Sequence, residues 1–275
     1  MKLKHLLFLI SACISSSYAQ QFAEEPYAPR TSYGLFGGGQ LNLHSGSFKG
    51  LPGIPNCCPE FKTGSGFGPY YGVFISFPLD AKLDMSLRIV NTTLSGKFTS
   101  EESEYFSTPT SGNGTGVWGT FNHTIDFEIQ SMGLNAMVNY KMSDKFRLNG
   151  GFRVGTLLTK NYSQIEEISS PSNGVFKNEG TRYRNKNNGV MPNAASIEAA
   201  LMAGVSYDFP LNSNYTMFLV PEANLGYSLT PYVSGLSWNT FTIAGGIGLR
   251  YAPREIIVPK PKLPPPPPPP PPPLP

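Results

Sequence analysis

Two adjacent cysteines, Cys57 and Cys58, are the residues whose types and spacing most directly suggest chemistry. They lie in residues 51–61, a segment that contains three prolines. A disulfide between neighbouring residues closes a small, strained ring, so it would be easily reduced. Three states remain open for this pair: a vicinal disulfide, free or intermolecularly paired thiols, and a metal site.

Two histidines, His44 and His123, are the other candidates for catalytic or metal chemistry beyond the first 19 residues. Nucleophilic or general-base catalysis needs a nucleophile and a base within hydrogen-bond reach of each other. No cluster of Ser, His and Asp has a spacing that indicates such an arrangement. The sequence therefore predicts that the protein is not an enzyme and needs no cofactor or metal. Both histidines are expected at the rims of loops.

Alternating apolar residues in about eight segments indicate the elements that must position these side chains. In residues 197–207, one face carries Ile, Ala, Leu, Val and Tyr, and the other carries Glu, Ala, Met, Gly and Ser. A soluble sheet would show more Lys and Glu on its second face. Small polar side chains instead fit the narrow interior of an eight-stranded barrel whose apolar face points at lipid. We therefore predict an all-β fold, a transmembrane eight-stranded antiparallel up-and-down β-barrel over residues 31–252.

Two stretches depart from the regular alternation. Three successive glycines, residues 37–39, interrupt the first segment and indicate a bend or a close approach of strands. In residues 121–141, the apolar residues sit at odd positions up to Ile129 and at even positions from Met132. This change of phase predicts a β-bulge near Ser131.

Eight charged residues fall on the polar faces of the predicted strands, and we expect them to meet inside the barrel. An Arg at the middle of the lipid would cost about 2–4 kcal/mol, whereas an Arg in a narrow lumen can pair with a carboxylate. The expected network has a middle layer of Arg88, Arg153 and Glu222, a lower layer of Asp84, Arg147 and Arg250, and an upper layer of Glu128 and Glu198. Such a network predicts a plugged lumen.

The connections between the segments are alternately short and long, which predicts the direction of the barrel. The short ones are residues 78–81, 141–145 and 210–214, and the long ones are residues 44–67, 99–121, 160–193 and 230–237. Outer-membrane barrels have short periplasmic turns and longer extracellular loops. We therefore expect both termini in the periplasm and the two cysteines in the first extracellular loop. Trp238 is expected in an aromatic girdle near the outer rim.

The two ends of the chain differ from the barrel in composition. Residues 1–19 have a basic start, an apolar stretch and a small-x-small cleavage site, which is the pattern of a signal peptide. A lipoprotein signal ending at Cys13 is the alternative, although its apolar stretch would be short. Residues 20–30 are a predicted periplasmic segment. Residues 253–275 are a predicted disordered, proline-rich periplasmic linker, whose ten consecutive prolines would span roughly 30 Å.

Charge and hydropathy exclude other classes of protein. The chain has 21 Lys and Arg against 18 Asp and Glu, and without Lys2 and Lys4 its net charge falls from +3 to +1. This near neutrality argues against nucleic-acid binding. After the signal, no stretch reaches the roughly 18 apolar residues that a spanning helix needs. Outer-membrane lipid, contacted by strands, is therefore the expected partner.

With its signal peptide, barrel and linker together, the chain resembles the amino-terminal half of OmpA-like outer-membrane proteins. The resemblance covers residues 31–275 and rests on architecture rather than on one diagnostic motif. It implies a role in stabilising the cell envelope and attachment to peptidoglycan through a domain that follows the linker. That domain is missing from this sequence, and we expect the reading frame to continue into it. A tail that itself meets a partner is the alternative.

The predicted function is that of an outer-membrane structural barrel that anchors or stabilises the envelope, with its linker directed toward the peptidoglycan. One alternative is a surface-exposed adhesin or ligand-binding barrel that acts through its extracellular loops. A second alternative is a soluble periplasmic barrel that binds a small apolar molecule.

Overall fold

The computed structural model describes residues 29–55, 60–106 and 117–254. Cys57, Cys58, the predicted signal peptide and the proline run lie outside these residues. All regular elements of the described part are strands: β1 (Ser32–Phe48), β2 (Phe61–Pro78), β3 (Leu83–Thr93), β4 (Gly96–Phe106), β5 (Val117–Lys141), β6 (Phe146–Ser170), β7 (Tyr183–Val190), β8 (Ile197–Tyr207), β9 (Phe209–Pro210), β10 (Met217–Ser228) and β11 (Ser237–Tyr251). No helix in this part of the chain has the length and apolar character needed to cross a membrane.

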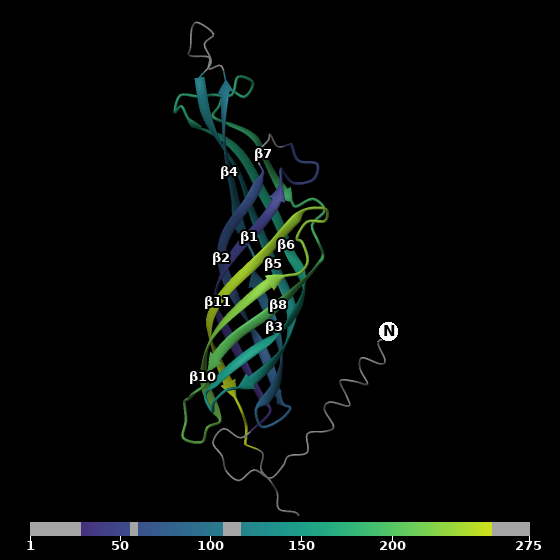
Figure 1. Cartoon of the computed structure of the whole chain (residues 1–275), viewed down its shortest axis with the longest axis vertical. Helices are drawn as coiled ribbons and strands as arrows, with labels where there is room; N and C mark the ends of the chain where they lie inside the picture. Colours follow the sequence, from purple (N-terminus) through teal and green to yellow (C-terminus); the bar gives the residue numbers. More distant parts are fainter. Residues whose placement is uncertain (1–28, 56–59, 107–116, 255–275) are drawn as a thin grey trace, which may run out of the picture.

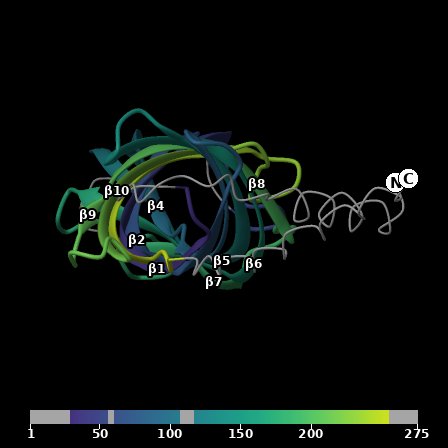
Figure 2. The same cartoon turned by 90° about the horizontal axis from the view of Figure 1, so that it is seen from below.

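The strands close into a ring. Each of β1, β2, β3, β5, β6, β8, β10 and β11 pairs antiparallel with the next strand in this order, and β11 returns to β1. Seen along its axis, the sheet encloses a lumen (Figure 2). The structure confirms the predicted fold class, an eight-stranded antiparallel β-barrel of the outer-membrane type.

Strands β3 and β4 are two parts of one long barrel strand. Thr93 pairs with Gln130 of β5, and Gly96 pairs with Phe127, so the register is the same on both sides of the interruption. At the interruption, the backbone N–H of Leu94 donates to the carbonyl of Ile129 at 2.7 Å. The break therefore changes local pairing without changing which side chains face inward.

Three of the barrel strands continue far beyond the ring, and we call the region made of β4, β7 and the adjoining halves of β5 and β6 the tall sheet (Figure 1). Strands β5 and β6 have 25 residues each, whereas a tilted strand needs only about 9–11 residues to cross a membrane. The prediction that residues 99–121 and 160–193 are loops was therefore largely wrong. These residues build strands because they pair with one another above the barrel.

An outward-facing apolar band surrounds the lower part of the barrel. Every barrel strand contributes exposed apolar side chains to this band: Leu35, Val73, Ile89, Leu134, Val154, Leu201, Leu225 and Ile247. Exposed apolar side chains on all sides of a closed ring are stable when lipid, not water, surrounds them. We call this part of the barrel the lipid band.

A β-bulge lies near Ser131, as predicted, but it is not the cause of the phase change in residues 121–141. Ile125 is fully buried and Met132 is 46 % exposed, yet the side chains of β5 alternate between inside and outside without interruption. The pairing with β6 does shift between Gln130 and Ser131, but the extra residue, Leu158, lies on β6. What changes on β5 is the face that is apolar: the outer face in the lipid band, and the inner face above it.

The successive glycines of β1 lie where strands approach closely. Gly38 pairs with Gly246 of β11, and a Cβ atom on Gly38 would lie 2.1 Å from the carbonyl oxygen of Gly245. Only a residue without a side chain fits at this distance.

Candidate functional site: the charged lumen and its apolar cap

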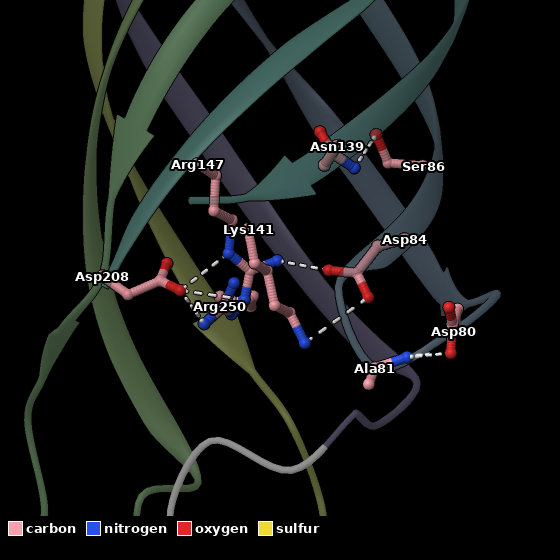
Figure 3. A network of polar contacts seen from close by, with 9 residues as sticks. All are labelled: Asp80, Ala81, Asp84, Ser86, Asn139, Lys141, Arg147, Asp208 and Arg250. Atoms are coloured by element: carbon pink, nitrogen blue, oxygen red, sulfur yellow. Dashed lines mark hydrogen bonds and ion pairs between the residues drawn. The ribbon is translucent and has the colours of Figure 1, made fainter. Parts of the chain in front are cut away.

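The lower end of the lumen holds a network of five charged side chains from five strands or turns (Figure 3). Arg147 contacts Asp84 at 2.6 Å and Asp208 at 2.8 Å. Arg250 contacts Asp208 at 2.7 Å, and Lys141 lies 3.8 Å from Asp84. The structure thus brings together the three residues expected in the lower layer and adds Lys141 and Asp208. Two carboxylates shared among three cations link β3, β5, β6 and β11 across the lumen.

The middle of the lumen is crossed by an ion pair between β3 and β10. Arg88 Nη1 lies 2.8 Å from Glu222 Oε2, and Tyr70 donates its hydroxyl to the other oxygen of Glu222 at 3.2 Å. The Arg88 guanidinium also lies over the rings of Phe36 and Phe74, at 5.3 and 5.6 Å from their centroids. Charge and aromatic contacts together hold this arginine in the interior.

Arg153 does not join the middle layer, which corrects the expected grouping. Its Nε donates to Glu198 Oε1 at 2.6 Å, and its two terminal nitrogens donate to Asn135 at 3.1 Å and to Ser131 at 2.9 Å. Glu198 also accepts a hydrogen bond from Ser131 at 2.5 Å. Arg153 and Glu198 lie on neighbouring strands, two residues apart in register, so this pair forms a separate upper layer.

Glu128 does not face the lumen, which corrects the expected upper layer. Its side chain is exposed on the outer face of β5, where Asn161 donates to it at 3.5 Å. The physical reason is that Glu128 lies above the lipid band, where the outer wall is polar. Charged residues of β5 therefore face outward above the lipid band, whereas charged residues of the barrel strands face the lumen within the band.

A small cavity lies between the middle and upper layers. This cavity has a volume of about 50 Å³ and is lined by Arg88, Arg153, Glu198 and Tyr232, among others. A volume of this size has room for a few water molecules.

Above the upper layer, the interior changes from polar to apolar, and we call this region the cap. Its buried members are Phe48, Leu51, Phe61, Leu94, Phe98, Ile125, Phe127, Ile129, Leu157, Tyr162, Met191, Tyr232, Val233 and Trp238. Trp238 packs edge-to-face against Phe98 and Phe127, with ring centroids at 5.2 and 4.7 Å. Trp238 was expected in an outer girdle, but it lies at the centre of the cap and is fully buried.

His44 also lies in the cap rather than at a loop rim. Its Nδ1 accepts a hydrogen bond from Trp238 Nε1 at 3.2 Å and lies 2.7 Å from the Thr240 hydroxyl. Its ring packs edge-on against Phe127 at 4.7 Å. These contacts assign His44 to the packing of the cap.

His123 occupies a different setting, on the inner face of the tall sheet. Its two ring nitrogens lie 3.9 Å from a carboxylate oxygen of Glu102 and 3.9 Å from one of Glu166. The pKa of His123 is lowered overall, mainly because burial desolvates the ring. Arg184 lowers it as well, and the carboxylates of Glu166 and Glu102 offset part of this shift. Glu166 is itself held by Arg184 Nε at 2.7 Å and by the Asn185 amide at 2.8 Å.

This cluster contains a histidine and two carboxylates. Within the described residues, no nucleophilic side chain is hydrogen-bonded to His123. Ser100 pairs with His123 across β4 and β5, yet its hydroxyl donates to the carbonyl of Glu60 at 3.3 Å. Within the described ranges, no three His, Cys, Asp or Glu side chains gather in a way that could hold a metal ion.

Comparison with known proteins gives fold-level likeness only. No family model and no curated protein matches the chain. Among solved structures, it is similar to Ail, the attachment invasion locus protein of Yersinia pestis, at 11 % identity and a TM-score of 0.35, covering 81 % of this chain and 99 % of that one. It is also similar to Neisserial surface protein A, NspA, at 12 % identity and a TM-score of 0.38, covering 80 % and 96 %.

A third solved structure corrects the prediction that the protein is not an enzyme. The outer membrane protease OmpT from Escherichia coli matches at 8 % identity and a TM-score of 0.31, covering 86 % of this chain and 100 % of that one. Because a protease is among the matched barrels, the architecture read from the sequence does not exclude catalysis. A likeness at this level does not establish an activity either.

Proposed function

We propose that this protein is a closed barrel of the outer membrane that stabilises the cell envelope and does not conduct solutes. The observation that carries the proposal is the apolar cap, which lies over a lumen already crossed by three layers of ion pairs. A conducting barrel needs a continuous aqueous path, whereas this interior is filled by side chains.

The envelope role and the orientation rest on the sequence. The resemblance to OmpA-like proteins and the proline-rich linker favour a periplasmic carboxyl end that extends toward peptidoglycan. Short connections at the lower end and the tall sheet at the other end favour an extracellular tall sheet. Peptidoglycan attachment through a domain beyond the linker is part of this proposal.

Single-channel recording in planar bilayers tests closure. The wild-type protein should show no steady conductance, and currents like those of a wide porin would contradict the proposal. Reading the coding sequence downstream of Pro275 tests the envelope role, since a stop codon directly after it would remove the expected peptidoglycan-binding domain.

A second candidate function is attachment to another surface through the tall sheet, and the edge of β4 favours it. In the described part of the chain, β4 pairs with β2 only at Phe98 and Lys97, so the strand beyond them has one open edge. Near its end, Tyr105 and Trp118 form an exposed cross-strand pair with ring centroids 5.8 Å apart. Open edges and exposed aromatic pairs are common at interaction surfaces.

Cells that display the barrel provide the test of this second function. Replacing Tyr105 and Trp118 together by Ser should reduce attachment to other cells while the barrel still folds. Unchanged attachment by the folded double variant would remove this candidate.

A further inference from the structure

The strand β4 rises above the barrel wall as part of the tall sheet (Figure 1). The whole of β4 pairs with β5 on one side, whereas β2 pairs with its other side only at Phe98 and Lys97. Just above this point, the Ser100 hydroxyl donates to the carbonyl of Glu60 at 3.3 Å. Within the described residues, no strand accompanies residues 101–106 on this side. About 20 Å of backbone edge can therefore accept a partner strand.

The side chains of this open edge carry an excess of negative charge. Glu101 shares the outward face of β4 with exposed Tyr105, and Glu102 and Glu104 share the inward face with buried Phe98. Within the described residues, none of the three carboxylates forms an ion pair with a Lys or Arg side chain. Both faces of the edge are therefore acidic.

The inward face behind the edge is also short of positive charge. The His123 ring is 2 % exposed and lies between Glu102 and Glu166, with a carboxylate oxygen 3.9 Å from each ring nitrogen. Its Nδ1 has no hydrogen-bond partner in the part of the chain that the structure describes. Arg184 pairs with Glu166 at 2.7 Å, which offsets that charge. A cation that reached the edge from this side would meet Glu102 and Glu104 without competition from an arginine or a lysine.

We propose that the open edge of β4 binds an extended, lysine- or arginine-rich segment of another protein as an added strand. The inference rests on the second candidate function, attachment through the tall sheet, and names the class of its partner. Backbone hydrogen bonds to residues 101–106 would hold the segment, and cross-strand pairs between its cations and the three carboxylates would select it.

The aromatic pair at the upper end of the edge fits the same partner. Tyr105 lies on the open strand, and its ring packs against Trp118 with the centroids 5.8 Å apart. A lysine or arginine opposite Tyr105 on the added strand would lie beside these two exposed rings, where cation–π attraction favours it.

Charge argues against other partners of this edge. A second copy of the same edge would bring two sets of three carboxylates together, so self-pairing is disfavoured. Charged side chains protect many natural sheet edges in this way. A nucleic acid or an acidic peptide would meet the same repulsion. A cationic strand is the partner for which these charges become an attraction.

Fluorescence anisotropy with the purified full chain in phosphatidylcholine nanodiscs tests the proposal. The probe is a labelled seven-residue peptide in which lysine alternates with threonine. One comparison peptide has glutamate in place of lysine, and another is the lysine peptide N-methylated at every residue, which keeps its charge but donates no backbone hydrogen bond. We expect both to bind at least tenfold more weakly than the probe. The variant with Glu101→Gln, Glu102→Gln and Glu104→Gln should also bind the probe at least tenfold more weakly.

The matched control is Glu179→Gln, which neutralises an exposed carboxylate in the connection between β6 and β7 and should leave binding of the probe unchanged. Absence of binding by the probe, or unchanged binding by the triple variant, would overturn the proposal. Equal binding of the N-methylated peptide would also overturn it, because the attraction would then need no added strand. Gel mobility before and after heating shows that each variant is folded.

The attachment assay on cells that display the barrel separates this inference from the function on which it rests. If attachment depends on Tyr105 and Trp118 but the probe does not bind, the partner class is wrong and the function stands. If the probe binds as expected but the Tyr105 and Trp118 double variant attaches unchanged, the function is removed and the strand site stands.

Discussion

The inward side chains are polar in the lumen inside the lipid band and apolar in the cap above it, although the same strands build both regions. On β5, Asn135 and Asn139 face inward and Leu134 and Val138 face outward within the band. Above it, apolar Ile125 and Phe127 face inward while charged residues face outward. The comparison shows that the alternation of a strand predicts two faces, but the medium outside decides which face is apolar.

The largest effect is expected when the cap and the middle layer of the lumen are weakened together. Trp238→Leu opens space in the cap, and Glu222→Ala leaves Arg88 without its carboxylate partner. Because the cap and the middle layer can each still fill the lumen when the other is weakened, each single variant should remain nearly silent in planar bilayers. The double variant keeps only the lower and upper ion pairs and should show brief openings of low conductance. A single Glu222→Ala variant that conducts freely would show that the cap does not close the barrel.

A large loss of stability is expected when the cap loses its central side chain. Trp238→Ala should lower the free energy of unfolding by about 3–5 kcal/mol, because it removes a buried aromatic side chain. Urea denaturation in detergent micelles, followed by circular dichroism, measures this loss. Trp118→Ala is the control, since the Trp118 side chain is 71 % exposed and its loss should cost about 0.5 kcal/mol or less.

A charge on the outer face of β5 should have effects that depend on height. Leu134→Arg places a cation against lipid and should destabilise the barrel by about 2–4 kcal/mol. Glu128→Arg places the same side chain on the same face above the band, where the expected cost is close to zero. Equal costs in folding titrations into lipid vesicles would mean that the lipid band does not end between these residues.

The smallest effect concerns pH and should be confined to the tall sheet. Because desolvation lowers the pKa of His123 in the folded state, the unfolded chain binds more protons at pH values between that pKa and about 6.5. Stability of the tall sheet should therefore be complete above about pH 6.5 and decrease as the pH falls below it. Glu102, Glu104, Glu166 and Arg184 surround the ring and set the size of this effect.

Amide hydrogen exchange measures the pH effect region by region. Protection factors, which remove the intrinsic slowing of exchange at lower pH, should fall in the upper parts of β5 and β6 on acidification, while those in the lipid band should not respond through this histidine. The His123→Gln variant, which cannot titrate, should remove the difference. A fall in protection that persists in the variant would assign the effect to the surrounding carboxylates.

Much of the barrel could be predicted from alternation because lipid imposes an apolar outer face on every strand. The height at which this rule ends could not be predicted, so Glu128 was assigned to the interior and Trp238 to the rim. The partner of each charged residue could not be predicted from alternation either. Arg153 contacts Glu198 because of the register between β6 and β8, which alternation does not specify. Alternation places Asp208 on the polar face of its segment, one residue beyond the end of β8, but it was left out of the expected network because alternation does not show which charges meet across the lumen.

The tall sheet was missed for a related reason. Residues 99–121 and 160–193 are rich in polar side chains, and polar segments between apolar strands resemble loops. A sheet whose outer face meets water does not need the apolar outer pattern used to find the other strands. The signal that remains is the inward series Ile125, Phe127 and Ile129, whose phase was attributed to the bulge near Ser131 and not to a change in the surrounding medium.

The abrupt reversal of polarity on β5 also determines how deeply the barrel sits in its membrane. Successive outward residues on a strand are about 7 Å apart, and on β5 the outer face passes from Glu128 through Gln130 to Met132. A displacement of one such step inward would submerge Gln130, and a second would submerge Glu128, while the opposite displacement would expose Met132 to water. Both directions cost free energy, so vertical drift and changes of bilayer thickness are resisted at this boundary. The barrel thus holds a constant depth, and whatever its upper strands present stays at a constant height above the membrane.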